Sequence, residues 1–325
     1  MIKKFNKNLS KNMLPYTFII IILGIILGYF YDLKSFSRLT TIIVLMMIYP
    51  MMINLSLSSL KKIRESKKPL IQALILNFII APLLMYFLIT VFEVSDQMKI
   101  AMMLLAIAPA SSMGLGYIGL AEGDMISGSI IIALAFILSI FVFPLAGHYL
   151  TVGTIFNIPI LLILKNLLII LIIPLILGII TREYIERRHG TEKYLKIKPY
   201  SSSLTLVALY FLIFVIFASK SRLILNNLID IWVLFPIALL FYGIIIFILL
   251  LLNKYVLKFE YGHHQAVVFT SVSKNIALTI AILVSVFGDD GEYMAIFPAI
   301  MALFQAPFLM IYLKFSGKIR RWFES

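Results

Sequence analysis

The sequence predicts an all-α integral membrane protein. Of its 325 residues, 62% are hydrophobic and 13% are charged, whereas a soluble domain carries about a quarter charged residues. Segments such as 16–31, 238–252 and 266–287 are apolar nearly all round, so they leave no polar face for water. Membrane barrels alternate apolar and polar residues along each strand, and this sequence shows no such alternation. Helices therefore span the bilayer.

Apolar runs between charged or turn-forming breaks predict ten membrane-spanning helices. A bilayer core about 30 Å thick requires about 20 apolar residues per helix. The predicted spans cover residues 14–31, 37–60, 69–92, 97–121, 125–149, 157–181, 200–219, 230–252, 262–287 and 291–315. The loops are short except for residues 182–199, which divide the chain into five spans and five. Basic residues precede the first run as in a signal peptide, but the run is too long and we expect a retained helix.

The basic residues are distributed unequally between the two sides of the membrane. With the N-terminus inside, 21 of the 28 lysines and arginines lie in cytoplasmic segments, five lie in outer loops and two lie within spans. This bias predicts a multi-pass protein of the cytoplasmic membrane with both termini in the cytoplasm. The net charge of +13 is thus a topology signal, and no extramembrane segment is long enough to bind nucleic acid. There is no cysteine, which excludes disulfides and thiolate sites.

The two halves of the chain share an internal pattern. The first and sixth spans both contain Leu-Gly-Ile-Ile, at residues 23–26 and 177–180. A Gly-Asp pair follows the fourth and ninth spans, and the fifth and tenth spans contain Pro144 and Pro307. Because each half has an odd number of spans, the second half is inverted relative to the first. We therefore predict two inverted repeats, residues 1–156 and 157–325, as in many secondary transporters.

A polar stretch rich in proline and glycine interrupts the fourth span. Pro109 removes a backbone donor and disfavours helix at the residue before it, and Gly114 and Gly116 permit unwinding. The hydroxyls of Ser111 and Ser112 are suited to bind the freed backbone groups or a solute. The alternative is a kinked helix whose glycines serve only close helix packing.

A second polar stretch lies at the corresponding place in the ninth span. Lys274 is about a dozen residues from either end of its span, and an ionisable residue at such depth indicates function. The neighbouring candidates are Thr270, Ser271, Ser273 and Asn275. The alternative for Lys274 is snorkelling to an interface.

Other polar residues are expected to be structural. His263 and His264 are expected at the membrane interface, and Asp124 and Asp289 in turns. No acidic residue lies mid-span, although proton relays and cation sites usually use carboxylates. The spans contain no His-Glu-x-x-His motif, Asp pair or Ser-His pairing, so we expect neither an enzyme nor a cofactor or metal site.

The polar stretches of the fourth and ninth spans resemble motifs of the bile acid:sodium symporter superfamily. Ala108-Pro109 together with residues 120–124 is similar to its proline-containing fourth helix, and residues 273–278 are similar to its ninth helix. The arsenite-efflux branch shares both patterns. The resemblance implies a core domain and a panel domain, with broken fourth and ninth helices that cross beside the solute path.

The sequence departs from this superfamily at the sodium sites. Sodium-coupled members have a Ser-Asn pair where this chain has Gly114 and Leu115. They have a glutamate and a glutamine where it has Thr270 and Lys274, and only Asn275 is retained. We therefore expect no specific sodium requirement.

The sequence also departs from the arsenite-efflux branch. That branch has a cysteine where this chain has Ala110, and a glutamate where it has Ala277. The resemblance therefore implies the fold but not the arsenite chemistry.

Together these observations predict a secondary transporter of a small organic anion, with the solute and the lipid bilayer as its partners. Efflux of arsenite or a related oxyanion is the first alternative, and a membrane sensor or scaffold that does not transport is the second. Direction of transport, coupling ion and oligomeric state stay open.

Overall fold

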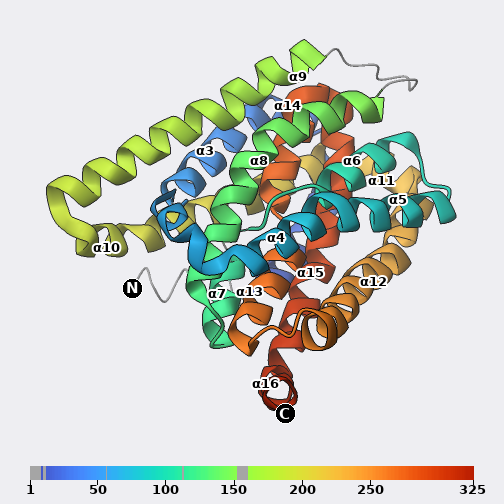
Figure 1. Cartoon of the computed structure of the whole chain (residues 1–325). Helices are drawn as coiled ribbons and strands as arrows, with labels where there is room; N and C mark the ends of the chain where they lie inside the picture. Colours follow the sequence, from blue (N-terminus) through green and yellow to red (C-terminus); the bar gives the residue numbers. More distant parts are fainter. Residues whose placement is uncertain (1–8, 10–11, 56, 112, 152–159) are drawn as a thin grey trace. The chain divides into compact units, whose positions relative to one another are not determined.

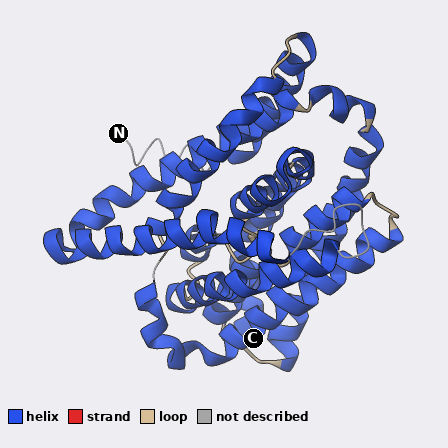
Figure 2. Ribbon diagram, turned by 90° about the horizontal axis from the view of Figure 1, so that it is seen from above, coloured by secondary structure: helices blue, strands red, loops and turns tan. Residues whose placement is uncertain are grey.

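The computed structural model describes residues 9, 12–55, 57–111, 113–151 and 160–325. Within these residues the chain forms helices and no strand, apart from one isolated bridge (Figure 2). The α-helices are α2 (Met13–Phe30), α3 (Thr40–Ile53), α4 (Lys67–Ile75), α5 (Ala81–Val91), α6 (Asp96–Ala106), α7 (Met113–Leu120), α8 (Met125–Thr151), α9 (Ile160–Leu167), α10 (Ile173–Ser219), α11 (Ser221–Asn226), α12 (Leu228–Leu251), α13 (Tyr261–Val272), α14 (Ile276–Met294), α15 (Ile296–Lys314) and α16 (Ser316–Glu324). Short 3-10 helices (η1, Lys34–Leu39; η2, Leu57–Ser66) and π-helical turns (η3, Leu76–Ile80; η4, Leu168–Ile172; η5, Leu252–Val256) adjoin them.

Six of the described helical stretches are long and apolar enough to cross a membrane. They are Lys34–Ile53, Ser59–Val91, Met125–Leu150, Leu164–Ser219, Leu228–Val256 and Ile296–Lys314. The first predicted span corresponds to a shorter apolar helix, Leu14–Phe30. The chain is therefore a helical, multi-pass membrane protein.

The long loop predicted at residues 182–199 is wrong, because this stretch is helical within α10. The helical geometry of α10 is interrupted at Gly190, whose φ of 79° and ψ of 160° suit glycine better than other residues. On the N-terminal side of Gly190, ion pairs Arg182–Glu186 (2.9 Å) and Arg187–Glu183 (3.0 Å) have the spacing that supports a helix.

The described chain divides into two compact units, each made of three segments. Unit 1 contains residues 1–55, 144–231 and 277–303, and unit 2 contains residues 56–143, 232–276 and 304–325. In unit 1, α10 packs along α2 and α3. A Cβ atom on Gly178 would lie 2.5 Å from the Met52 Cβ, so the missing side chain permits this close packing.

Unit 2 is built around α13, which packs against α4, α7 and α16 (Figure 1). All its residues from His264 to Val272 are buried, so the polar side chains among them require partners inside the protein. The two polar stretches singled out by the sequence both lie in this unit.

Candidate functional site: two paired helix breaks

Both predicted interruptions are present, but the first is shorter than predicted, because Gly114 and Gly116 are helical within α7 (Met113–Leu120) and not unwound. Helix α6 ends at Ala106 and α7 begins at Met113, while α13 ends at Val272 and α14 begins at Ile276. Proline accounts for the first break, because Pro109 cannot donate to the helical ladder. The second break contains no proline, and bonds from outside its own helix hold it open.

The backbones of the two breaks pair with each other. Ala110 and Lys274 form an isolated antiparallel bridge. On either side of it, Ser111 N donates to Ser273 O at 2.7 Å, and Asn275 N donates to Pro109 O at 2.9 Å. These bonds satisfy polar groups that helix termini otherwise leave exposed to an apolar surrounding. The predicted contact between the breaks is therefore confirmed.

Gln305 of α15 secures the second break from another side. Its Oε1 accepts a hydrogen bond from Lys274 N at 2.9 Å, and its Nε2 donates to Lys274 O at 3.4 Å. One amide side chain thus substitutes for a backbone partner at both polar groups of the same residue. Gln305 was not among the site residues predicted from the sequence.

The Lys274 side chain is fully buried. Its Nζ donates to Asn77 Oδ1 at 2.7 Å and lies 3.5 Å from Ala108 O. Among the residues that the structure describes, Lys274 forms no ion pair with a carboxylate. The snorkelling alternative is therefore wrong for this structure, because the ammonium points into unit 2 and not to an exposed surface.

The hydroxyls of α13 differ in their partners. Thr270 donates to Ala266 O at 2.7 Å and Ser273 donates to Phe269 O at 2.6 Å, so both hydroxyl protons are bound within their own helix. Ser271 Oγ is buried and has no hydrogen-bond partner in the described part of the chain. Of these three predicted site residues, only Ser271 has a buried hydroxyl left unpaired.

The candidates on the α7 side also fall into distinct groups. A Cβ atom on Gly114 would lie 2.7 Å from Ser273 Oγ, so this glycine permits close packing of α7 against α13. Gly116 is exposed, with no atom within 4 Å of such a Cβ atom, and lies apart from the paired backbones. Ser111 Oγ accepts a hydrogen bond from the start of α7 at 3.3 Å. Ser112 lies outside the described residues.

The amide side chains of Asn77 and Gln305 are the site residues that sequence reasoning missed. Both are polar residues inside otherwise apolar spans, a signal that was available in the sequence. Asn77 lies in the π-helical turn η3, and such turns occur frequently at functional sites.

His264 corrects a further expectation. It was predicted to lie at the interface, but it is fully buried. Its Nδ1 lies 2.9 Å from Asn253 Nδ2 and its Nε2 lies 2.8 Å from Tyr312 Oη, so both ring nitrogens have partners that allow burial. His263 instead lies 3.2 Å from Asp124, which caps α8 by accepting from Ile126 N at 2.9 Å.

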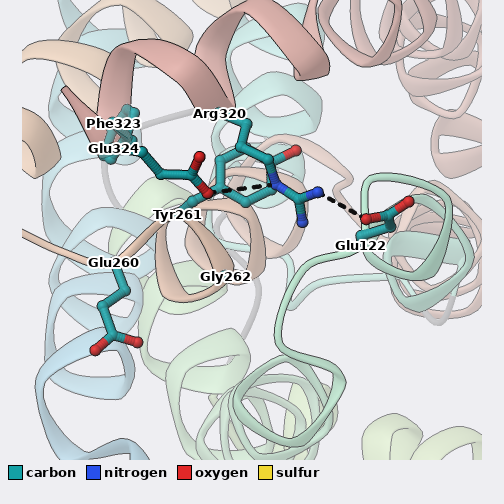
Figure 3. Close-up of a pocket in the computed structure, with 7 residues that line it drawn as sticks. All are labelled: Glu122, Glu260, Tyr261, Gly262, Arg320, Phe323 and Glu324. Atoms are coloured by element: carbon teal, nitrogen blue, oxygen red, sulfur yellow. Dashed lines mark hydrogen bonds and ion pairs between the residues drawn. The ribbon is translucent and has the colours of Figure 1, made fainter.

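A hollow of about 450 Å³ lies where α16 meets the start of α13 (Figure 3). It is lined by Glu122, Glu260, Tyr261, Gly262, Arg320, Phe323 and Glu324. Arg320 pairs with Glu122 at 2.8 Å and with Glu324 at 3.8 Å, and the hydrogen bond to Glu122 raises the pKa of its guanidinium. Three carboxylates outnumber one guanidinium, so this hollow does not suit an anion.

A helical membrane protein with a buried lysine at two paired helix breaks has the construction of a solute transporter. The sequence pattern of the Sodium Bile acid symporter family matches residues 41–227, more than half of the chain. The chain belongs to this family of membrane transporters.

Curated relatives extend the similarity over most of the chain. An uncharacterized transporter of Synechocystis sp. is 24% identical over 299 residues, which cover 85% of this chain and 77% of the relative. The Arsenical-resistance protein Acr3 of Alkaliphilus metalliredigens is 23% identical over 87% of this chain and 82% of its own length. The protein of that name from Corynebacterium glutamicum is 26% identical, over 75% and 69%.

Proposed function

We propose that this chain is a secondary transporter that moves a small organic anion across the cytoplasmic membrane. Its ten spans would form two inverted repeats of five, with both termini in the cytoplasm. The breaks at residues 107–112 and 273–275 support this arrangement, because they fall at matching places of the two predicted repeats. The bias of lysine and arginine supports the orientation.

One observation carries the choice of an anion: Lys274 is a fully buried basic side chain at the paired breaks and has no carboxylate partner among the described residues. An isolated buried charge is costly, and a bound anion would offset that cost. Helices α7 and α14 begin directly after the breaks, and helix N-termini carry partial positive charge. Neither break contains an aspartate or a glutamate.

In this proposal the ammonium of Lys274 takes the place of a sodium ion. The sodium-coupled pattern has a glutamine at this position and binds the ion with oxygen ligands nearby. A tethered ammonium supplies similar electrostatics, but it cannot dissociate on the far side of the membrane. Transport would then proceed by uniport or exchange, unless the lysine releases a proton during the cycle.

Efflux of arsenite is the second candidate, because two of the curated relatives are named arsenical-resistance proteins. Ala110 stands where the arsenite-efflux pattern has a cysteine, so a thiolate cannot bind arsenic here. Arsenous acid is neutral at neutral pH and gives no reason for a buried, unpaired cation. The organic anion therefore explains more of the site.

Purified protein in liposomes tests the proposal. Uptake of labelled small carboxylates and of arsenite would be measured for the wild-type protein and for Lys274→Ala, with imposed sodium and proton gradients. We expect carboxylate transport that Lys274→Ala reduces at least about tenfold, because a hydrogen bond to a charged group is worth about 1.5–3 kcal/mol. Transport of arsenite alone would favour the second candidate. A wild-type protein that moves none of these solutes would indicate a sensor or scaffold.

A further inference from the structure

The amide of Asn77 has a defined orientation. Lys274 Nζ can only donate hydrogen bonds, so the side-chain atom that faces it at 2.7 Å is the oxygen Oδ1. The Nδ2 group must therefore point elsewhere. It is fully buried, and it has no hydrogen-bond partner among the residues that the structure describes.

The backbone of η3 holds this amide in place. Ala81 N donates to Leu76 O across the π-helical turn, and Pro82 follows without a backbone N–H. The turn adds a residue to the helix and rotates the following side chains relative to an unbroken α-helix. Asn77 is therefore set by the local backbone and not only by its contact with Lys274.

Two donors of different kinds are thus adjacent at the paired breaks. The ammonium of Lys274 keeps hydrogen-bonding capacity beyond Asn77 and Ala108, and Nδ2 of Asn77 is bonded to the same carbon as the oxygen that Lys274 contacts. Buried donors without acceptors are unfavourable, and native structures usually pair them. A ligand with two neighbouring acceptor oxygens would pair both.

We infer that Lys274 and Asn77 form a two-donor site for the carboxylate group of a small monocarboxylate. This inference rests on the proposed function and names the class of solute. A carboxylate presents two acceptor oxygens to such a pair of donors. Only one cation is present at the breaks, so a monoanion balances the charge whereas a dicarboxylate would leave one charge uncompensated. Asn77 is then a specificity-determining residue.

Two variants of Asn77 test this role. Asn77→Asp replaces the Nδ2 donor by an oxygen of nearly the same size and pairs Lys274 internally. Asn77→Ala removes the donor without adding a charge. The probes are the choline salts of acetate, propionate and pyruvate, with succinate as the dicarboxylate. The readouts are thermal stabilisation of the purified protein by each salt and uptake into liposomes.

We expect wild-type protein to be stabilised by a monocarboxylate and not by succinate. Asn77→Asp should abolish this stabilisation and uptake while raising the melting temperature of the unliganded protein. Asn77→Ala should weaken binding about tenfold or more, since a charged acceptor loses one of its two donors. As a control, Asn253→Asp changes another buried amide of unit 2, whose side chain contacts Gln72 and His264, and it should leave the affinity unchanged.

Lys274→Gln separates failure of this inference from failure of the proposed function. If Lys274→Gln abolishes transport of a monocarboxylate but Asn77→Asp binds and transports it as wild type does, Asn77 has no role in recognition and the inference is overturned. Wild-type protein that binds succinate but no monocarboxylate would also overturn it. Monocarboxylate transport that neither variant changes would overturn the roles of Lys274 and Asn77 and leave transport of an organic anion standing, whereas wild-type protein that moves no organic anion would overturn the proposed function.

Discussion

Lys274 raises a question at the scale of a single residue: whether its proton stays bound throughout the transport cycle. Its Nζ is buried, and its only described partners are neutral oxygens of Asn77 and Ala108. Burial disfavours the charged form of a lysine, and a bound anion favours it. Solute binding and release would therefore change the proton affinity of this group in opposite directions.

Substitution of Lys274 by arginine and by glutamine distinguishes a static charge from a proton carrier. If the charge is static, Lys274→Arg should retain more uptake than Lys274→Gln, and uptake should change little between about pH 6 and pH 8, since arginine stays protonated. If the lysine carries the proton, arginine should fail as completely as glutamine, and an imposed pH gradient should drive wild-type uptake. Initial rates in liposomes at several pH values provide the measurement.

Lys165→Gln is the matched control, because this lysine of α9 is exposed and belongs to unit 1. It should leave both the rate and its pH dependence unchanged. Wild-type rates and pH dependence in Lys274→Ala would contradict both versions of the lysine's role.

Residue types alone predicted Lys274 as a site residue but did not predict its partner. A lysine deep in an apolar span is visible in the sequence, because it is costly in a bilayer. Asn77 is 197 positions away along the chain, and the packing of α13 against α4, which η3 continues, brings the two side chains together. The predicted roles of Thr270 and Ser273 were weakened for a similar reason: their hydroxyls bond to the backbone of their own helix.

At the scale of elements, local chemistry predicted where the helices break, and tertiary contacts determined which groups form hydrogen bonds with the freed backbone. Pro109 marks the first break directly. In the second break, the helix ends at Val272 without proline or glycine, and the side chain of Gln305 takes over the hydrogen bonds. No rule of helix propensity in the sequence places Gln305 beside Lys274.

Two of the three glycines of α7, Gly114 and Gly116, allow a test of how this helix packs against α13. Gly114→Ala places a Cβ atom 2.7 Å from Ser273 Oγ and 3.2 Å from Phe269 O, so either Ser273 or α7 must shift. We expect a loss of about 1–3 kcal/mol of stability, as for other overpacked cores. The same shift displaces Ser111 from Ser273, so transport should fall as well. Thermal unfolding in detergent and liposome uptake would measure the two effects.

Gly116→Ala is the internal control on the same helix. A Cβ atom there meets nothing within 4 Å, and alanine is a better helix former than glycine by up to about 1 kcal/mol. This variant should therefore be as stable as wild type or more stable. Equal losses of stability in both variants would show that close packing of α7 on α13 does not depend on Gly114.

For the whole molecule, hydropathy located the apolar segments better than the connections between them. Continuous spans such as Leu228–Val256 match the prediction closely. The stretch at residues 182–199 was predicted as a loop from its charges, but it is helical on both sides of a kink at Gly190, and ion pairs support the part before the kink. The boundary predicted between the two repeats, at residues 156 and 157, lies outside the described residues, so the inverted repeat stays a prediction.

The electrostatics of unit 2 predict a transporter without a specific sodium requirement. Sodium prefers several oxygen ligands, and a carboxylate among them offsets its charge. The two breaks contain no carboxylate, and the Lys274 ammonium would repel a metal ion bound beside it.

Replacing sodium by potassium at constant ionic strength should therefore change initial rates by less than about twofold, far below the effect of removing an interaction with a charged group. Liposome uptake of a carboxylate that the wild-type protein transports is the measurement, and a third series in choline controls for effects of either metal ion. Uptake that is lost in potassium and choline and restored by sodium would mean that a sodium site exists beside Lys274, and the proposal that the lysine replaces the ion would have to be abandoned.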